Sequence, residues 1–290
     1  METPAKPVPT ERARAESAFY DRYARQLHTE QLSPLAVFAP TCRENIDLLA
    51  RLGDLRGRRV LDIGCGQGDT SVWFALQGAE VWALDVSAEM VKLTSELAAR
   101  HDRAATVHAT VGRVEDLALA DDFFDLVFAD GVLHHLDMRL AVPNLVRLLK
   151  PGGRGFFFEP QKGSLFIEIY RRFARDLRTA DERPLEDSDF RFLEEQFGGL
   201  THDEYHLVSL LLFGARFIQL KLSGRAFPYW MDEVRQGQVC PQLLRWLQAI
   251  DGRLCAWLPY CRRWCWKTFI RAEKRARPAD GLPRHGSGIS

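Results

Sequence analysis

The stretch Val60–Gly68 reads V-L-D-I-G-C-G-Q-G and joins a short apolar run to a loop that contains three glycines. Gly64, Gly66 and Gly68 stand on alternate positions, and a helix-like apolar pattern follows at once. A strand, a glycine-rich turn and a helix in this order place the turn at the carboxyl edge of a parallel sheet, where nucleotide-bearing ligands bind. The stretch therefore predicts an α/β fold with a cofactor at the edge of its sheet.

The glycine spacing separates two classes of nucleotide cofactor. A dinucleotide-binding fingerprint, G-x-G-x-x-G, needs its third glycine at position 69, where this chain has Asp69. The next predicted strand ends in an acid, Asp85, which suits hydrogen bonds to a ribose 2′,3′-diol. Asp85 indicates a ribose-bearing cofactor, whereas Asp69, together with the later K-P-G-G motif (Lys150–Gly153), disfavours a nicotinamide-dependent oxidoreductase.

Residues 58–158 alternate between strand-like and helix-like patterns, which predicts a parallel sheet with helices on both faces. The segment Lys150–Gly153, K-P-G-G, is expected to end the third helix and to turn into the fifth strand. The predicted helices are Thr70–Gln77, Ser87–Arg100 and Arg139–Leu149. The predicted strands are Arg59–Ile63, Val81–Asp85, Ala105–Ala109, Phe124–Ala129, Gly155–Phe158, Thr201–Leu207 and Trp264–Ala272.

A chain of 290 residues can bury one large core, and this one reads as a single core with additions. An amphipathic helix is expected over residues 11–32, and two helices over 163–200 flank the loop R-T-A-D-E-R-P-L (Arg178–Leu185). The expected parts are an N-terminal arm and lid helix (1–57), the core (58–207), a helical apolar insertion (208–263), a last strand (264–276) and a disordered tail (277–290).

Composition excludes several classes of protein. The 39 basic and 39 acidic residues balance, so net charge does not indicate nucleic-acid or membrane binding. The N-terminus lacks the apolar centre of a secretory signal, and the run Leu207–Leu222 is shorter than the roughly 20 residues of a membrane span. The six cysteines include no C-x-x-C pair, so no metal site is predicted. We expect a reduced cytoplasmic protein, either a monomer or a homodimer.

Four motifs carry a resemblance to a known family. They are V-L-D-I-G-C-G-Q-G, A-L-D-V-S (Ala83–Ser87), F-D-L-V-F-A-D-G-V-L-H-H-L (Phe124–Leu136) and L-L-K-P-G-G (Leu148–Gly153). In this order and spacing the chain resembles the class I S-adenosylmethionine-dependent methyltransferases, closely over residues 60–160 and more loosely over 11–60 and 160–275. The resemblance implies a Rossmann-like, seven-stranded, mostly parallel sheet whose last strand is antiparallel. It also implies S-adenosylmethionine over the strand tips, with S-adenosylhomocysteine as the product.

The resemblance further implies roles for the residues around the loop. Asp62 would lie beneath the loop near the amino group of the cofactor, Asp85 would bind the ribose, and Val86 would pack against the adenine. The residues implied in cofactor binding are Asp62, Gly64, Cys65, Gly66, Gly68, Asp85, Val86, Arg113, Val114, Glu115 and Asp130.

One segment departs from the family pattern. Gly112–Leu117 reads G-R-V-E-D-L, where the family often has G-D-A-E-D-L along the adenine edge. Arg113 therefore replaces the usual acid or amide. Backbone groups at Val114, or Glu115, are the alternatives for meeting the adenine amino group.

Methyl transfer from a sulfonium is an in-line displacement, so the protein mainly aligns the reactants and excludes water. A hydroxyl or amine acceptor must also lose a proton, and histidine is the natural base. His134 and His135 follow the fourth predicted strand, and either of them is a candidate base or a support for the loop. Asp130 is a candidate contact of the methionine moiety or of the substrate.

Three further residues are candidates for contact with the substrate. Glu159 ends the fifth predicted strand and is expected at the substrate mouth. Tyr20 and Tyr23 lie on the N-terminal helix, which this family commonly uses as a lid over the cofactor. Ordinary packing of an aromatic helix face is the alternative interpretation of the two tyrosines.

The insertion is rich in large apolar groups and predicts a roof over a bulky, largely apolar acceptor, such as a pigment, quinone, polyketide-like or lipid-like molecule. A dimer interface or an extra core layer is the alternative. The groups are Leu210–Phe213, Phe217, Phe227, Tyr229, Trp230, Trp246, Trp257 and Tyr260. A late basic cluster is interpreted as a solvated face, with anionic lipid headgroups or RNA as the alternative partners; it comprises Arg262, Arg263, Lys267, Arg271, Lys274, Arg275 and Arg277.

The sequence thus predicts a methyltransferase that acts on a small molecule, with oxygen as the favoured acceptor atom and nitrogen or carbon left open. A nucleic-acid methyltransferase is disfavoured, because Ala129–Val132 stands where such enzymes often carry Asn/Asp-Pro-Pro-Tyr to hold a flipped base. A non-catalytic protein that binds the cofactor remains the third class.

Overall fold

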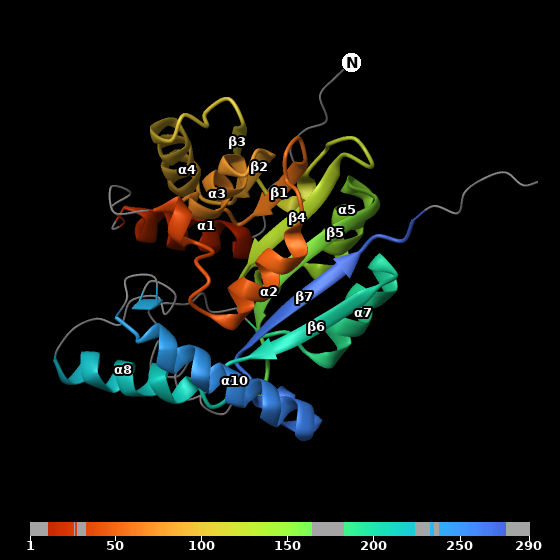
Figure 1. The fold of residues 1–290 in the computed structure, drawn as a ribbon. Coiled ribbons are helices and arrows are strands. Elements are labelled where there is room, and N and C mark those ends of the chain that lie inside the picture. Colours follow the sequence, from red (N-terminus) through yellow and green to blue (C-terminus); the bar gives the residue numbers. More distant parts are fainter. Residues whose placement is uncertain are drawn as a thin grey trace, which may run out of the picture.

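The fold is built around one seven-stranded sheet in the order β3-β2-β1-β4-β5-β7-β6 (Figure 1). The structure is a computed structural model that describes residues 11–25, 27, 33–163, 183–223, 233–234 and 238–276. The strands are β1 (Arg59–Ile63), β2 (Glu80–Asp85), β3 (Val107–Val111), β4 (Phe124–Asp130), β5 (Leu149–Pro160), β6 (Leu200–Tyr205) and β7 (Lys267–Glu273).

Five strands are parallel, and β7 runs antiparallel between β5 and β6. This topology confirms the predicted seven-stranded, mostly parallel sheet. Because β6 is antiparallel to β7, it points the same way as β5, and its last residue lies at the carboxyl edge of the parallel strands. That edge carries the glycine loop after β1 and Asp85 at the end of β2.

The K-P-G-G segment is the clearest departure from the expected boundaries. It was expected to separate helix from strand, but β5 begins at Leu149 and runs through it. Phe124 pairs with Leu149 and Leu126 with Arg154, so the strand bulges between these two pairs. Gly152 has a φ of +74°, and a Cβ at Gly153 would lie 2.8 Å from the Lys150 carbonyl oxygen, which explains why the bulge is made of glycines.

Helices cover both faces of the sheet, and side chains alternate between two cores. Phe128 and Phe158 point toward α2, α3 and α4, whereas Val127 and Phe157 point toward α5 and α7. The helices are α1 (Glu11–Ala24), α2 (Arg43–Leu52), α3 (Asp69–Leu76), α4 (Ala88–Arg100), α5 (Met138–Leu148), α7 (Asp187–Phe197), α8 (Leu210–Leu222) and α10 (Pro241–Trp257). Short 3-10 helices are η2 (Pro34–Ala36), η3 (Val114–Asp116), η4 (Leu133–His135) and η6 (Pro259–Trp264).

The insertion forms α8 and α10, which lie together at the foot of the view in Figure 1. They share a small core of their own, made of Cys42, Leu210, Phe213, Val234, Val239 and Leu244. Buried Asp251 of α10 accepts hydrogen bonds from the backbone amides of Leu207 and Val208 and from the Ser209 hydroxyl, and so fixes α10 to the start of α8. The insertion is therefore attached to the carboxyl end of β6.

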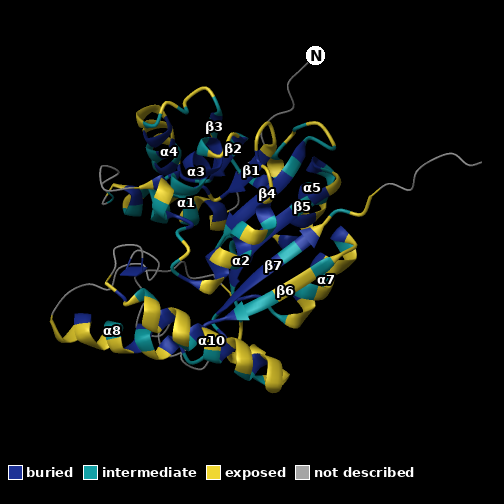
Figure 2. Ribbon diagram, viewed as in Figure 1, coloured by how far each residue is buried: buried dark blue, intermediate teal, exposed yellow. Residues whose placement is uncertain are grey.

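Several apolar residues predicted to roof a substrate lie on the outside instead. Trp246, Trp257 and Tyr260 are 61%, 81% and 64% exposed, so these three do not line an enclosed pocket (Figure 2). The reason is that α10 carries large apolar groups on both faces and the inner face is filled by others. Phe227, Tyr229 and Trp230, nearly all of the helix expected before the Arg178–Leu185 loop, and the tail 277–290 fall outside the described residues.

No helix in the described part of the chain is long and apolar enough to cross a membrane.

Candidate functional site

The glycine loop leaves room for a ligand at one position. The amides of Gly64 and Cys65 donate to the Leu84 carbonyl oxygen at 2.7 and 3.1 Å, which ties the loop to the end of β2. Gly66 has a φ of +53° and no atom within 4 Å of the place where a Cβ would stand. This open space beside a strained backbone is the cradle that a bound cofactor would fill.

The other two loop glycines serve packing. A Cβ at Gly64 would lie 2.4 Å from Val132, and one at Gly68 would lie 2.6 Å from the backbone of Thr94 in α4. Cys65 is buried, with its Sγ 3.5 Å from the Thr94 hydroxyl. These residues therefore hold the loop against η4 and α4, and the prediction that they line the cofactor stays a prediction.

Asp85 lies where a ribose would meet the loop. Its carboxylate accepts hydrogen bonds from the amides of Gly66 at 3.0 Å and Ser87 at 2.8 Å, and burial raises its pKa. Each oxygen accepts one of these bonds and keeps further acceptor capacity, so the carboxylate can also accept from ligand hydroxyls. Half-buried Val86 follows it directly.

Acidic groups dominate the electrostatics beneath the loop. Asp62 is buried and accepts a 2.5 Å hydrogen bond from the Ser71 hydroxyl. Burial is the largest cause that raises the pKa of Asp62, and together with the nearby Asp69, Asp85 and Asp130 it brings this pKa to about 8, against the lowering effect of the Ser71 hydrogen bond. A ligand that brings positive charge would relieve this repulsion and favour the carboxylate.

The predicted adenine edge contains a buried acceptor. Arg113 donates to Glu115 Oε1 at 2.8 Å, and the amide of Asp137 lies 3.3 Å from the same oxygen. Glu115 Oε2 is buried and accepts no hydrogen bond from any described residue. Because the Val114 carbonyl already accepts from Asn144 at 2.6 Å, Glu115 Oε2 is the acceptor best suited to an incoming amino group.

His134 belongs to a buried scaffold that includes Glu159. The Glu159 carboxylate is fully buried and accepts from the backbone amides of Val132 at 3.0 Å and Leu133 at 2.6 Å. The His134 Nδ1 lies 2.6 Å from the same carboxylate. The expectation that Glu159 reaches the substrate mouth does not hold, because its oxygens point back into the η4 loop rather than outward.

His135 forms a second imidazole–carboxylate pair, in this case with the N-terminal helix. Its Nδ1 lies 3.1 Å from Glu16 Oε1, and the two side chains are 8% and 15% exposed. The His135 ring lies 4.2 Å from the His134 ring and 6.3 Å, edge-on, from that of Tyr20. Burial raises the pKa of Glu16 to about 7; Arg12 and His134 lower it, whereas Asp85 and Glu115 raise it.

The helix α1 is fixed over this site by one acid. Asp21 accepts hydrogen bonds from the Ser87 hydroxyl at 2.5 Å and the Glu89 amide at 3.3 Å, at the start of α4. Ser87 in turn caps α4 by accepting from the Met90 amide. Half-buried Tyr23 lies on the same helix. The structure thus brings α1 against the start of α4, beside Asp85, and the lid role of α1 stays a prediction.

Asp130 lies at the end of β4 and meets a lysine from β7. The Nζ atom of Lys267 is 3.2 Å from the Asp130 carboxylate and 4.4 Å from the centre of the Phe158 ring. Lys267 is buried, which overturns its assignment to a solvated basic cluster. Two other members of that cluster are also paired, Arg271 with Asp203 and Lys274 with Asp122.

Sequence reasoning missed Glu16, Asp21 and Lys267. Glu16 and Tyr20 are four residues apart and share one helix face, a spacing that predicts a common environment. No comparable signal exists for Lys267, because only the sheet order places β7 next to β5 and so brings the Lys267 ammonium group across β5 to the end of β4.

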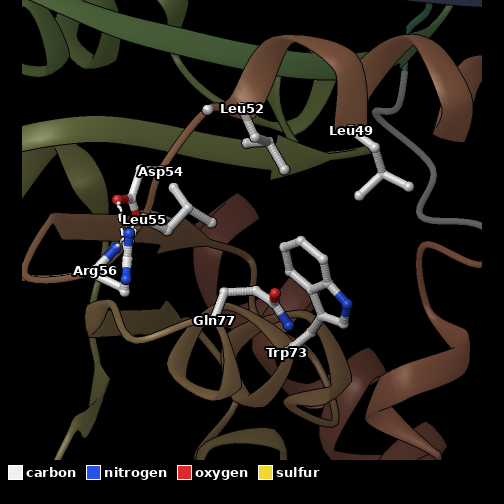
Figure 3. Close-up of a pocket in the computed structure, with 8 residues that line it drawn as sticks. Leu49, Leu52, Asp54, Leu55, Arg56, Trp73 and Gln77 are labelled. Carbon is white, nitrogen blue, oxygen red and sulfur yellow. Dashed lines mark hydrogen bonds and ion pairs between the residues drawn. The ribbon is translucent and has the colours of Figure 1, made fainter.

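A separate hollow lies at the opposite edge of the sheet (Figure 3). It is bordered by the end of α2 and by α3, where Arg56 pairs with Asp54 beside Leu55. This edge holds the amino ends of the parallel strands, away from the glycine loop. Within the described residues no group of three or more histidine, cysteine or acidic side chains could hold a metal ion.

Comparison with known proteins agrees with this geometry. Residues 61–157 match the family described as methyltransferase domain. The chain is 40% identical over 126 residues to a malonyl-[acyl-carrier protein] O-methyltransferase of Pseudescherichia vulneris, which covers 42% of this chain and 47% of the relative. It is 32% identical over 118 residues to a ubiquinone/menaquinone biosynthesis C-methyltransferase of Geotalea daltonii, covering 39% of this chain and 50% of the relative. The chain therefore spans about half the length of the curated relatives it matches.

A solved structure extends the likeness in fold to most of the chain. Geranyl diphosphate C-methyltransferase from Streptomyces coelicolor superposes with a TM-score of 0.58 at 14% identity, covering 94% of this chain and 100% of that one. The glycine loop, Asp85 at the end of β2, the sheet with its antiparallel β7 and the matched domain agree with one another. Over residues 61–157 the chain matches the methyltransferase-domain family, and its fold agrees with that match.

Proposed function

We propose that this protein transfers a methyl group from S-adenosylmethionine to a hydroxyl oxygen of a bulky, largely apolar small molecule. The observation that carries the proposal is the position of the His135–Glu16 pair, which lies between the lid helix and the cofactor loop at the carboxyl edge of the sheet. A histidine held by a carboxylate at this edge is suited to taking a proton from an acceptor.

The cofactor is proposed to lie across Gly66, with its ribose on Asp85 and its amino group near Asp62. The acidic surroundings of Asp62 support this orientation, since the cofactor carries positive charge. Glu115 Oε2 is proposed to accept from the adenine amino group; its burial without a hydrogen-bond partner among the described residues supports this choice over the backbone at Val114. When bound, S-adenosylmethionine supplies an electrophilic methyl group on a sulfonium.

Removing the ribose acid tests this orientation. Asp85→Ala should weaken binding of S-adenosylhomocysteine about tenfold or more, ~1.4 kcal/mol, because two ribose hydroxyls lose their acceptor. Titration calorimetry measures the effect. Asp187→Ala, at an exposed acid in the first turn of α7, is the matched control and should leave the affinity unchanged. Equal affinities for Asp85→Ala and the wild type would refute the ribose assignment.

Asp62 should make the unliganded fold less stable as the pH rises. Its pKa is raised to about 8 in the folded chain, against roughly 3.9 for an unfolded aspartate. Between these values the folded chain holds a proton that the unfolded chain has released, so the unfolding free energy falls as the pH increases. Asp62→Asn keeps an acceptor for Ser71 and should flatten this dependence.

Urea denaturation of the two proteins between about pH 5 and pH 8 measures the difference, which can reach roughly 1.4 kcal/mol per pH unit for one proton. Glu16, whose pKa is raised to about 7, contributes in the same direction in both proteins and cancels. If the unfolding free energies of the wild type and of Asp62→Asn change with pH in parallel, Asp62 is not held in its protonated form.

His135 is proposed as the base, and His134 as its support. The Nδ1 of His135 is directed at Glu16, so the basic nitrogen is Nε2 on the other side of the ring. With the methyl group supplied by the bound cofactor, Nε2 of His135 would receive the proton that the acceptor hydroxyl loses. Glu16 stabilises the resulting imidazolium, as the carboxylate of a catalytic triad does.

The apolar acceptor is supported by the large apolar groups of the insertion, which is attached at the same edge of the sheet. The curated relatives named above include one O-methyltransferase and one C-methyltransferase. Both oxygen and carbon are therefore examined as acceptor atoms in the experiment below. Tyr20 and Tyr23 on α1 remain proposed lid residues, and Asp130 with Lys267 is proposed to border the acceptor.

The experiment is methyl transfer from isotopically labelled S-adenosylmethionine to a panel of alkyl phenols, hydroquinones, long-chain carboxylic acids and arylamines. We expect label in ether or ester products. Label on a carbon or nitrogen atom of the product would show that oxygen is not the acceptor atom. If the cofactor binds but no compound of the panel becomes labelled, the proposed acceptor class is contradicted.

A further inference from the structure

The outer face of α10 and η6 carries an unusual concentration of exposed aromatic rings. Trp257 is 81% exposed, Tyr260 64% and Trp246 61%. Exposed tryptophans are costly in water unless another surface covers them. We call this set the aromatic face; it comprises Leu243, Trp246, Trp257, Leu258, Tyr260 and Trp264, each at least 42% exposed.

The pattern along α10 is that of an amphipathic helix with an apolar outer side. Leu243, Trp246, Arg253 and Trp257 are spaced by three, seven and four residues and so share one side of the helix. The opposite side is buried and includes Leu244, Gln248, Asp251 and Cys255. The inner side is already packed, and the aromatic face is therefore a second, separate surface (Figure 2).

The exposed charged groups on this surface are all positive, although Arg262 Nε lies 3.9 Å from the carboxylate of Glu204, whose side chain is 2% exposed. Arg245, Arg253, Arg262 and Arg263 are all exposed. Over residues 238–266, all of them described, Asp251 is the single acid, and it is buried against the start of α8. Arg245 and Arg253 form no ion pair with any described residue, and the Arg263 guanidinium stacks 4.7 Å from the centre of the Tyr260 ring.

We propose that the aromatic face docks onto the surface of an anionic lipid bilayer. Tryptophan and tyrosine favour the headgroup region of a membrane, and exposed arginines bind the phosphates there. A second copy of this chain is the competing occupant. In a two-fold interface the same arginines would face each other across an apolar contact, and such like-charge pairing is unfavourable.

Docking in this way would bring the functional site close to the bilayer. The helix η6 leads directly into Lys267, the first residue of β7, whose ammonium group contacts Asp130 at the carboxyl edge of the sheet. The aromatic face and the cofactor loop therefore belong to the same edge. The interaction itself does not depend on the proposed reaction, because it involves other residues.

Cosedimentation with vesicles tests the proposal on the full chain. We expect binding to phosphatidylcholine vesicles that contain phosphatidylglycerol, little binding to phosphatidylcholine alone, and weaker binding as salt increases. The double variants Trp246→Ala/Trp257→Ala and Arg245→Gln/Arg253→Gln should each lower the partition coefficient about tenfold or more. Leu140→Ala on α5 and Arg191→Gln on α7 change exposed residues of matching kind outside this face and should have no effect.

Each variant is first checked for unchanged binding of S-adenosylhomocysteine, which separates loss of docking from loss of folding. Equal binding to neutral and anionic vesicles, or none to either, would overturn the proposal. So would a dimer in sedimentation velocity that Trp257→Ala dissociates while vesicle binding is absent, since the occupant would then be a second copy. Retention of single-stranded RNA without vesicle binding would likewise overturn it.

Discussion

Replacing Glu159 by alanine is expected to lower the unfolding free energy by about 3–5 kcal/mol, the range seen when one partner of a buried charged network is removed. The carboxylate is fully buried and accepts from the amides of Val132 and Leu133 as well as from His134. Alanine would leave these donors without an acceptor inside the protein, and it would open a cavity between β5 and η4.

Urea denaturation measures this loss. Glu159→Gln keeps one acceptor oxygen and should fall between alanine and the wild type. Glu195→Ala, at an exposed glutamate of α7, should change stability by no more than about 0.5 kcal/mol. A Glu159→Ala protein as stable as the Glu195→Ala control would show that the η4 loop is held by something else.

Replacing His135 by alanine is expected to lower kcat about 10²–10⁴-fold, the usual contribution of a positioned general base. Binding of S-adenosylhomocysteine should change little, because His135 is proposed to act on the acceptor rather than on the cofactor. The measurement is the rate of labelled methyl transfer at saturating cofactor, with the best acceptor from the panel.

Two matched variants separate chemistry from support. His134→Ala should lose stability rather than kcat, since His134 is bonded to buried Glu159. Glu16→Gln should lower kcat less than His135→Ala, because it removes the carboxylate that stabilises the imidazolium but leaves the imidazole in place. Glu11→Gln, at an exposed position of α1, should leave kcat unchanged. Full activity in His135→Ala would remove the base from the mechanism.

The parts of the site that were predictable are local in the sequence. The alternate glycines, Asp69 and Asp85 all lie within one strand–helix–strand unit, where short spacing fixes geometry. The parallel sheet over residues 58–158 followed from alternating patterns, the seven-stranded arrangement was implied by the family resemblance, and β1 has the predicted bounds.

The parts that were not predictable depend on contacts between distant segments. Lys267 reaches Asp130 only because β7 is inserted antiparallel between β5 and β6. His134 and His135 are neighbours in the chain and looked equivalent, yet one is bonded to β5 and the other to α1. The apolar content of α10 predicted that its large side chains would be buried. Composition alone does not show which side of a helix faces the core, and Trp257 lies on the side that faces solvent.

The central claim is that the glycine loop binds S-adenosylmethionine, and titration calorimetry of the full chain tests it most directly. S-adenosylmethionine and S-adenosylhomocysteine should each bind at one site with a micromolar dissociation constant, which corresponds to a binding free energy of about −8 kcal/mol. NAD should give no binding heat. Saturable binding of NAD, with no heat from either adenosyl ligand, would contradict the account.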